Sequence, residues 1–108
     1  MITVRFTYSD GLYSGFSVQG HAGLAPKGED VLCASVSSAA YLIANTLTEV
    51  CKAPCDAVVS DGRMTVRLSE WDDASVQVLL KGFALHMREL SRQYPRQLKV
   101  IYGGKNNA

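Results

Sequence analysis

Apolar and polar residues alternate over residues 2–8 and 98–102, near the two ends of the chain. A two-residue period is typical of a strand that buries one face. A turn at Asp10-Gly11 lets residues 15–19 return as a second strand, with about four residues between the two. Residues 57–59 and 64–68 flank Asp61-Gly62, and Asp-Gly between two such runs is a strong hairpin signal. The alternation predicts two hairpins and a final strand.

Apolar residues recur at three-and-four spacing over residues 32–50 and 73–94, which predicts two helices. Apolar residues also fill other faces of the first segment, as expected for a helix buried on several sides. A glycine-rich loop is expected over residues 20–30, and Pro95 ends the second helix. The order β-β-α-β-β-α-β predicts an α+β layered domain with a largely antiparallel sheet and one central buried helix. Residues 103–108 form a polar tail that we expect to be mobile.

Composition narrows the class of protein. The 108 residues, 47% of them hydrophobic and 19% charged, suit a single domain over residues 1–108. Eleven basic residues against ten acidic ones leave a net charge of +1, which argues against direct nucleic acid binding through bulk electrostatics. Residues 31–48 carry no charge and approach the length of a membrane span. A third of them have hydrogen-bonding side chains, so we expect a buried helix and no membrane partner.

The cysteines and the N-terminus favour a cytoplasmic protein. Cys33, Cys51 and Cys55 are too few for a disulfide-stapled secreted fold. The alternating N-terminal residues also differ from the continuous apolar block of a signal peptide.

Candidate chemistry lies in residues 20–37. His21 follows a predicted strand and Cys33 lies in the first turn of the predicted helix, so an imidazole and a thiol are expected at the same edge of the fold. A free cysteine thiol is only partly ionised at neutral pH, and a helix N-terminus and a nearby imidazolium both favour the thiolate. A lone cysteine in an apolar helix is usually a core residue. Its pairing with His21 favours a nucleophile and its base.

Gly20-His21-Ala22 followed by residues 28–37, Gly-Glu-Asp-Val-Leu-Cys-Ala-Ser-Val-Ser, closely resembles the signature of the bacterial ribosomal-processing cysteine protease family, Prp. By this resemblance His21 is the catalytic histidine and Cys33 the nucleophile, while Asp30 and Ser37 match two further polar positions. Leu32 and Ser35 stand where many relatives have valine and alanine. Those two changes are expected to alter packing beside the thiol more than chemistry.

The resemblance implies an endopeptidase that needs no cofactor. It implies removal of the short N-terminal extension of one large-subunit ribosomal protein, the bacterial homologue numbered twenty-seven, after a motif ending in paired phenylalanines. The resemblance also implies a homodimer in which the glycine-rich loop covers the bound peptide and must move to admit it. In this chain the loop contains Gly23, Leu24, Pro26 and Gly28, and its length independently favours a functional role.

The expected mechanism starts with proton transfer from Cys33 to His21 and attack of the thiolate on the scissile carbonyl. The backbone amides of Cys33 and Ala34 at the helix start are candidates for the oxyanion site. Asp30 either orients His21 or caps the helix, and sequence position favours the cap. Ser37 lies one turn after Cys33 and either donates a bond within the site or bonds its own backbone.

Two other functions remain open at this point. In a non-catalytic ribosome-associated binding module, His21 and Cys33 would be incidental. A metal hydrolase would use His21, Asp30 and Cys33 as ligands, but three ligand types on one loop lack a paired-ligand spacing. Cys51 and Cys55 have no second pair with which to hold zinc, and no metal is expected.

Overall fold

The computed structural model of the protein describes residues 1–20 and 27–103, with the backbone alone at residues 27–30. The predicted tail at 103–108 lies outside this range except for Gly103, which ends the last strand. The elements are β1 (Ile2–Ser9), β2 (Leu12–Gln19), α1 (Lys27–Asn45), a π-helical turn η1 (Thr46–Val50), β3 (Cys55–Ser60), β4 (Arg63–Leu68), α2 (Ala74–Gln93) and β5 (Leu98–Gly103). Their order confirms the predicted α+β class.

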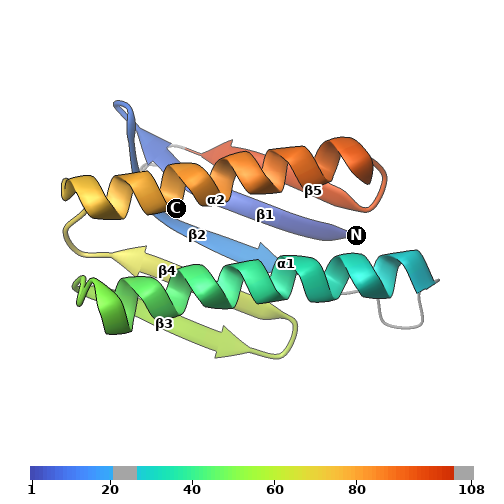
Figure 1. Cartoon of the computed structure of the whole chain (residues 1–108), viewed down its shortest axis with the longest axis horizontal. Coiled ribbons are helices and arrows are strands. Elements are labelled where there is room, and N and C mark those ends of the chain that lie inside the picture. Colours follow the sequence, from blue (N-terminus) through green and yellow to red (C-terminus); the bar gives the residue numbers. More distant parts are fainter. Residues whose placement is uncertain (21–26, 104–108) are drawn as a thin grey trace.

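The five strands form one sheet in the order β3-β4-β2-β1-β5, and both helices lie on the same face of it (Figure 1). Only the β1–β5 pair is parallel among the described strands, so the sheet is largely antiparallel, as predicted. Val4, Val18 and Met64 lie in one register row across β1, β2 and β4 and are buried beneath the helices. Side-chain alternation therefore leaves the polar residues of each strand on the opposite face.

The two Asp-Gly turns form as predicted, although the first is tighter than expected. Asp10 and Gly11 have φ values of 56° and 79° and join β1 to β2 through a two-residue loop. Because both residues adopt positive φ, β2 begins at Leu12 instead of residue 15. In the β3–β4 hairpin the two-residue loop is Asp61-Gly62, where Gly62 has a φ of 70°.

The prediction of a central helix buried on several sides is wrong for α1. Its buried residues, Leu32, Val36, Ala40, Ile43 and Ala44, follow one helical face, whereas Val31, Tyr41 and Leu42 are exposed. The helix packs on one face of the sheet, where α2 is the one described element beside it (Figure 1). The segment Val31–Val50 is long and apolar enough to cross a membrane by length and composition only. Its buried face packs in the core of this domain.

The first helix also begins earlier than predicted, at Lys27. Gly28 reads as a helix breaker in the sequence, but one glycine near a helix end costs only about 1 kcal/mol relative to alanine. Acidic residues such as Glu29 and Asp30 are favoured near the positive end of a helix dipole. The balance of these local preferences permits an additional turn before Val31.

The second helix is fixed at its N-terminus and at one buried polar residue. The Asp73 carboxylate caps its N-terminus by accepting from the backbone amides of Ser75 and Val76. Gln77 is buried, and its side chain bonds both backbone groups of Tyr13 on β2, at 2.9 and 2.8 Å. This contact holds α2 against the irregular start of β2, where the register shifts between Thr7 and Tyr8.

Candidate active site

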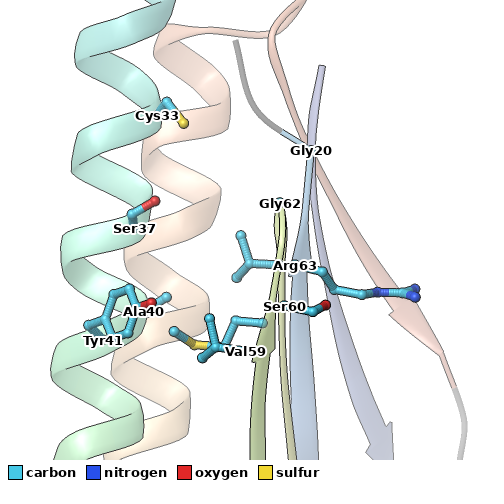
Figure 2. Close-up of a pocket in the computed structure, with 11 residues that line it drawn as sticks. Gly20, Cys33, Ser37, Ala40, Tyr41, Val59, Ser60, Gly62 and Arg63 are labelled. Atoms are coloured by element: carbon cyan, nitrogen blue, oxygen red, sulfur yellow. The ribbon is translucent and has the colours of Figure 1, made fainter. Parts of the chain in front are cut away.

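A hollow of about 160 Å³ lies between α1 and the neighbouring ends of β2, β3 and β4 (Figure 2). Cys33 lines it from α1, and Gly20 and Gly62 line it from the sheet side. Its remaining lining residues are Val18, Ser37, Ala40, Tyr41, Val59, Ser60, Arg63 and Met64. The hollow therefore combines a thiol and hydroxyl groups with an apolar floor.

The helix supplies the polar groups at regular intervals. Cys33, Ser37 and Tyr41 are each four residues apart, so they form a stripe along one side of α1 (Figure 2). Cys33 is half-buried, carries a free thiol and packs against the hydrophobic core. Ser37 is half-buried one turn further along the same stripe. This placement brings the two sequence-predicted side chains to one hollow.

The sheet side is fixed by two glycines. The backbone N–H of Gly20 donates to the carbonyl oxygen of Gly62 at 2.9 Å, which ties the end of β2 to the β3–β4 turn. Gly20 has φ of 98°, and a Cβ built there would lie 2.3 Å from the carbonyl oxygen of Met1. Only glycine fits this position without strain. The residue that precedes His21 in the sequence is thus held at the rim of the hollow that Cys33 lines.

The β3–β4 hairpin was not predicted to belong to the site. Val59 and Met64 lie opposite each other in the hairpin and both line the hollow. Their contribution depends on β4 pairing with β2, two strands that are far apart in the sequence. The spacing of Cys33, Ser37 and Tyr41 was an available signal that Tyr41 shares the site.

Several predicted site residues lie outside the described part of the chain. His21 and the lid residues Gly23, Leu24 and Pro26 belong to residues 21–26, so their predicted roles stay predictions. Gly28 was assigned to the loop but lies within α1. Asp30 is the fourth residue of α1, so its position is not that of an N-cap, and its side chain is outside the described set.

The earlier helix start also corrects the expected oxyanion site. With α1 beginning at Lys27, Cys33 is its seventh residue and Ala34 its eighth. Only the first four N–H groups of a helix lack an internal partner, so the amides of Cys33 and Ala34 belong to the hydrogen-bonded body of this helix. Ala34 is also exposed and lines a groove on the other side of α1 with Leu42 and His86.

The other cysteines differ from Cys33 in their surroundings. Cys51 and Cys55 both carry free thiols. Burial, together with the neighbouring Asp56 carboxylate, raises the pKa of the Cys55 thiol. Among the described residues no group of three or more His, Cys, Asp or Glu is placed to hold a metal ion. Cys55 lines a separate groove on β3 and β4, whereas Cys33 shares its hollow with Gly20, so Cys33 is the cysteine whose position suits the predicted nucleophile.

Solved structures with the same fold include those of one bacterial protease. Staphylococcus aureus ribosomal processing protease Prp, with a substrate peptide, has a TM-score of 0.87 at 22% identity, covering 95% of this chain and 100% of that one. The same protease with a covalently linked product peptide has a TM-score of 0.85 at 23% identity, with the same coverage. SMU.848 from Streptococcus mutans has a TM-score of 0.85 at 25% identity, covering 97% of this chain and 99% of that one.

The sequence itself identifies the family. No curated protein matches the chain significantly. The family model described as "Cysteine protease Prp" matches residues 1–99, which include the hollow, Cys33 and the segment between Gly20 and α1. The resemblance seen in residues 20–37 thus extends over nearly the whole chain. This protein belongs to the cysteine protease Prp family.

Proposed function

We propose that this cysteine protease removes the N-terminal extension of a large-subunit ribosomal protein, the bacterial homologue numbered twenty-seven. The observation that carries the proposal is that Gly20 and Cys33 line one hollow, because His21 is joined directly to Gly20. Family membership supports the reaction class. The related S. aureus protein is described as a ribosomal processing protease and was crystallised with a substrate peptide, which supports the class of substrate.

The proposed reaction has two stages. The imidazole of His21 accepts the proton of the Cys33 thiol, and the thiolate attacks the scissile carbonyl carbon. The peptide C–N bond breaks, the leaving amine takes the proton from His21, and a thioester to Cys33 remains. Water then adds to the thioester with His21 as base, releasing the new carboxylate and restoring the thiol.

Activation of the thiol is assigned to His21 in this proposal. Cys33 is the seventh residue of α1, and the effect of a helix dipole falls off within the first turn. Ser37 and Tyr41 lie on the stripe beside the thiol and present hydroxyl groups to a bound peptide. The apolar floor of Val59 and Met64 is suited to an uncharged substrate side chain.

The enzyme is proposed to act as a homodimer through its helices. Leu42 of α1 and Val78 of α2 are both exposed and line one shallow groove between the helices. A second groove continues from it along α1, and His86 is the only titratable side chain lining either one among the described residues. An apolar surface of this kind has no charge that opposes a second copy of itself, which fits a two-fold interface. We refer to the surface formed by these two grooves as the helix face.

The proposed compartment is the cytoplasm, where a ribosomal substrate is made. The three cysteines at positions 33, 51 and 55 carry free thiols, in keeping with a reducing compartment.

A peptide cleavage assay tests the function. A synthetic peptide spanning the extension and the first residues of the mature ribosomal protein is incubated with the enzyme, and the products are identified by mass spectrometry. We expect one cut, abolished in Cys33→Ala and reduced at least about 100-fold in His21→Ala. Cys51→Ala and Cys55→Ala are matched controls that retain cleavage, because neither residue lines the hollow.

The same assay separates the alternatives. Cleavage that stops on addition of a chelator supports a metal hydrolase with His21, Asp30 and Cys33 as ligands. Binding of the peptide or of ribosomal particles without cleavage supports the non-catalytic module. Cleavage that survives Cys33→Ala overturns the assignment of the nucleophile.

A further inference from the structure

The sheet face opposite the helices carries a concentration of positive charge. Both helices lie on the other face, and no described element covers this one (Figure 1). Strand alternation places Arg5 of β1, Arg63 and Arg67 of β4 and Lys99 of β5 on it, and all four are exposed. We call this surface the open sheet face.

The charge on the open sheet face is not balanced locally. Asp56, which pairs with Arg67 in the β3–β4 register, is the only acidic residue that a described strand places there. Within the described residues the one ion pair joins Arg92 to Glu89 on α2. Four cations thus stand against one carboxylate, although the whole chain has a net charge of only +1. The near-zero total conceals the separation of charge between the faces.

Three of the cations surround a hollow of about 300 Å³. Arg5, Ser17 and Thr65 form one row across β1, β2 and β4. Arg63 and Arg67 lie two residues to either side of Thr65, so their backbones are about 13 Å apart along β4. The hydroxyls of Ser17 and Thr65 are therefore bordered by guanidinium groups from β1 and from β4.

Local contacts keep this hollow open. Gly15 is the partner of Arg67 in the β2–β4 register and presents no side chain. A Cβ at Gly15 would lie 2.4 Å from the carbonyl oxygen of Val66, so close strand packing requires glycine there. The Arg63 side chain extends away from α1 (Figure 2) and donates to Gln19 Oε1 at 3.0 Å. Its guanidinium is thereby held on the open sheet face.

We propose that the open sheet face binds the phosphate backbone of RNA, with Arg5, Arg63 and Arg67 as the principal contacts. Guanidinium groups donate paired hydrogen bonds to phosphate oxygens, and serine and threonine hydroxyls add single donors. An open surface that spans several strands suits an extended polyanion better than a small enclosed ligand.

An acidic protein is a less suitable occupant. Protein interfaces draw most of their binding energy from tryptophan, tyrosine and arginine side chains that are buried near the centre, and the arginines of this face have no aromatic partner among the residues that the described strands place there. The aromatic rings of this sheet pack on the helix side instead, where Phe6 and Phe16 both contact Phe83 of α2. The same lack of an aromatic platform predicts RNA binding that is sensitive to salt and indifferent to base sequence.

The test measures fluorescence anisotropy of a labelled twenty-nucleotide RNA of mixed sequence, titrated with protein at 50 and 200 mM salt. The triple variant Arg5→Gln, Arg63→Gln, Arg67→Gln is compared with Lys81→Gln, Arg92→Gln, Arg96→Gln. The second set removes the same charge from exposed residues that lie on α2 or just beyond it. We expect the first set to weaken affinity at least tenfold and the second less than threefold.

The salt dependence provides an independent readout. The slope of log affinity against log salt should fall by about 2 in the first set, since each phosphate contact on a single strand contributes about 0.7. Thermal unfolding verifies that the variants fold. If the first triple variant does not fold, Arg67→Gln alone replaces it, and its expected loss of RNA affinity is about threefold.

Three outcomes overturn the proposal. The first is no binding by the unmodified protein at 50 mM salt, and the second is equal weakening in the two triple variants. The third is competition by polyglutamate that equals competition by unlabelled RNA, which would assign the face to an acidic protein. None of these readouts uses proteolysis, so they are independent of the proposed reaction.

Discussion

Gly20 and Gly62 are joined by a 2.9 Å hydrogen bond from the amide of one to the carbonyl oxygen of the other. They lie 42 positions apart in the chain, one at the end of β2 and one in the β3–β4 turn. Both line the hollow that contains Cys33. The bond therefore fixes the rim of the site at the point where the chain leaves the sheet toward His21.

Substitution of Gly20 should cost more stability than substitution of another glycine with a positive φ. Gly20→Ala combines a positive φ with a Cβ placed 2.3 Å from the Met1 carbonyl oxygen. Gly11 has φ of 79°, but a Cβ at that residue would have no other atom within 4 Å. We expect a loss of at least about 3 kcal/mol for Gly20→Ala and about 1 kcal/mol for Gly11→Ala, measured by urea unfolding. Equal losses would contradict the role of the Met1 contact.

Removal of the Gln77 amide should destabilise the domain without opening a cavity. In Gln77→Leu the N–H and C=O of Tyr13 and the C=O of Trp71 lose their side-chain partner. Buried unsatisfied polar groups cost about 1 to 3 kcal/mol each, so the loss of three such bonds predicts a loss of at least about 3 kcal/mol in chemical denaturation. Gln93→Leu at the exposed end of α2 is the control, with a change within about 0.5 kcal/mol. A neutral Gln77→Leu would show that water replaces the amide.

Local chemistry explains which parts of the fold were predictable. The Asp10-Gly11 and Asp61-Gly62 turns follow from residues that adopt positive φ or tolerate a tight reversal, and the strands follow from period-two alternation. Gln77 gave no such signal, because its partners on β2 and at Trp71 are known only once the chain has folded. The start of α1 at Lys27 does not follow from the sequence pattern, because Gly28 indicates a helix break and hides the helix-compatible residues beside it.

The candidate site likewise contains residues that the sequence indicates and residues that only the folded chain brings together. The sequence indicates Cys33 through its pairing with His21 and Ser37 through the family resemblance, and α1 places both on one stripe. Val59 and Met64 were not found, because the β3–β4 hairpin reaches the site only through pairing of β4 with β2. The open sheet face was missed for a related reason, since a net charge cannot reveal which side of a sheet each arginine occupies.

The Cys55 thiol should ionise, and therefore react, at a higher pH than an ordinary cysteine thiol. Burial raises its pKa, and the Asp56 carboxylate adds to the effect by opposing the thiolate. At alkaline pH the folded protein still holds the Cys55 proton while the unfolded chain has released it. The contribution of Cys55 to stability is therefore present below about pH 9 and declines as the pH rises further. Asp56→Asn should speed alkylation of Cys55 at pH 8 by up to about fivefold, measured by peptide mass spectrometry in a Cys33→Ala, Cys51→Ala background. An unchanged rate would assign the whole effect to burial.

A charge introduced on the helix face should dissociate the proposed homodimer. Leu42 is 65% exposed on α1, and Val58 is 59% exposed on the opposite side of the sheet. Leu42→Glu and Val58→Glu therefore add the same charge at comparable exposure on different faces. We expect the unmodified protein and Val58→Glu to sediment at twice the 11.7 kDa chain mass, and Leu42→Glu to sediment at the single-chain mass. The reason is that burying an unpaired carboxylate at an apolar interface is strongly unfavourable. Dissociation by Val58→Glu alone would place the dimer interface on the open sheet face. A second copy of the protein would then compete with RNA for that face.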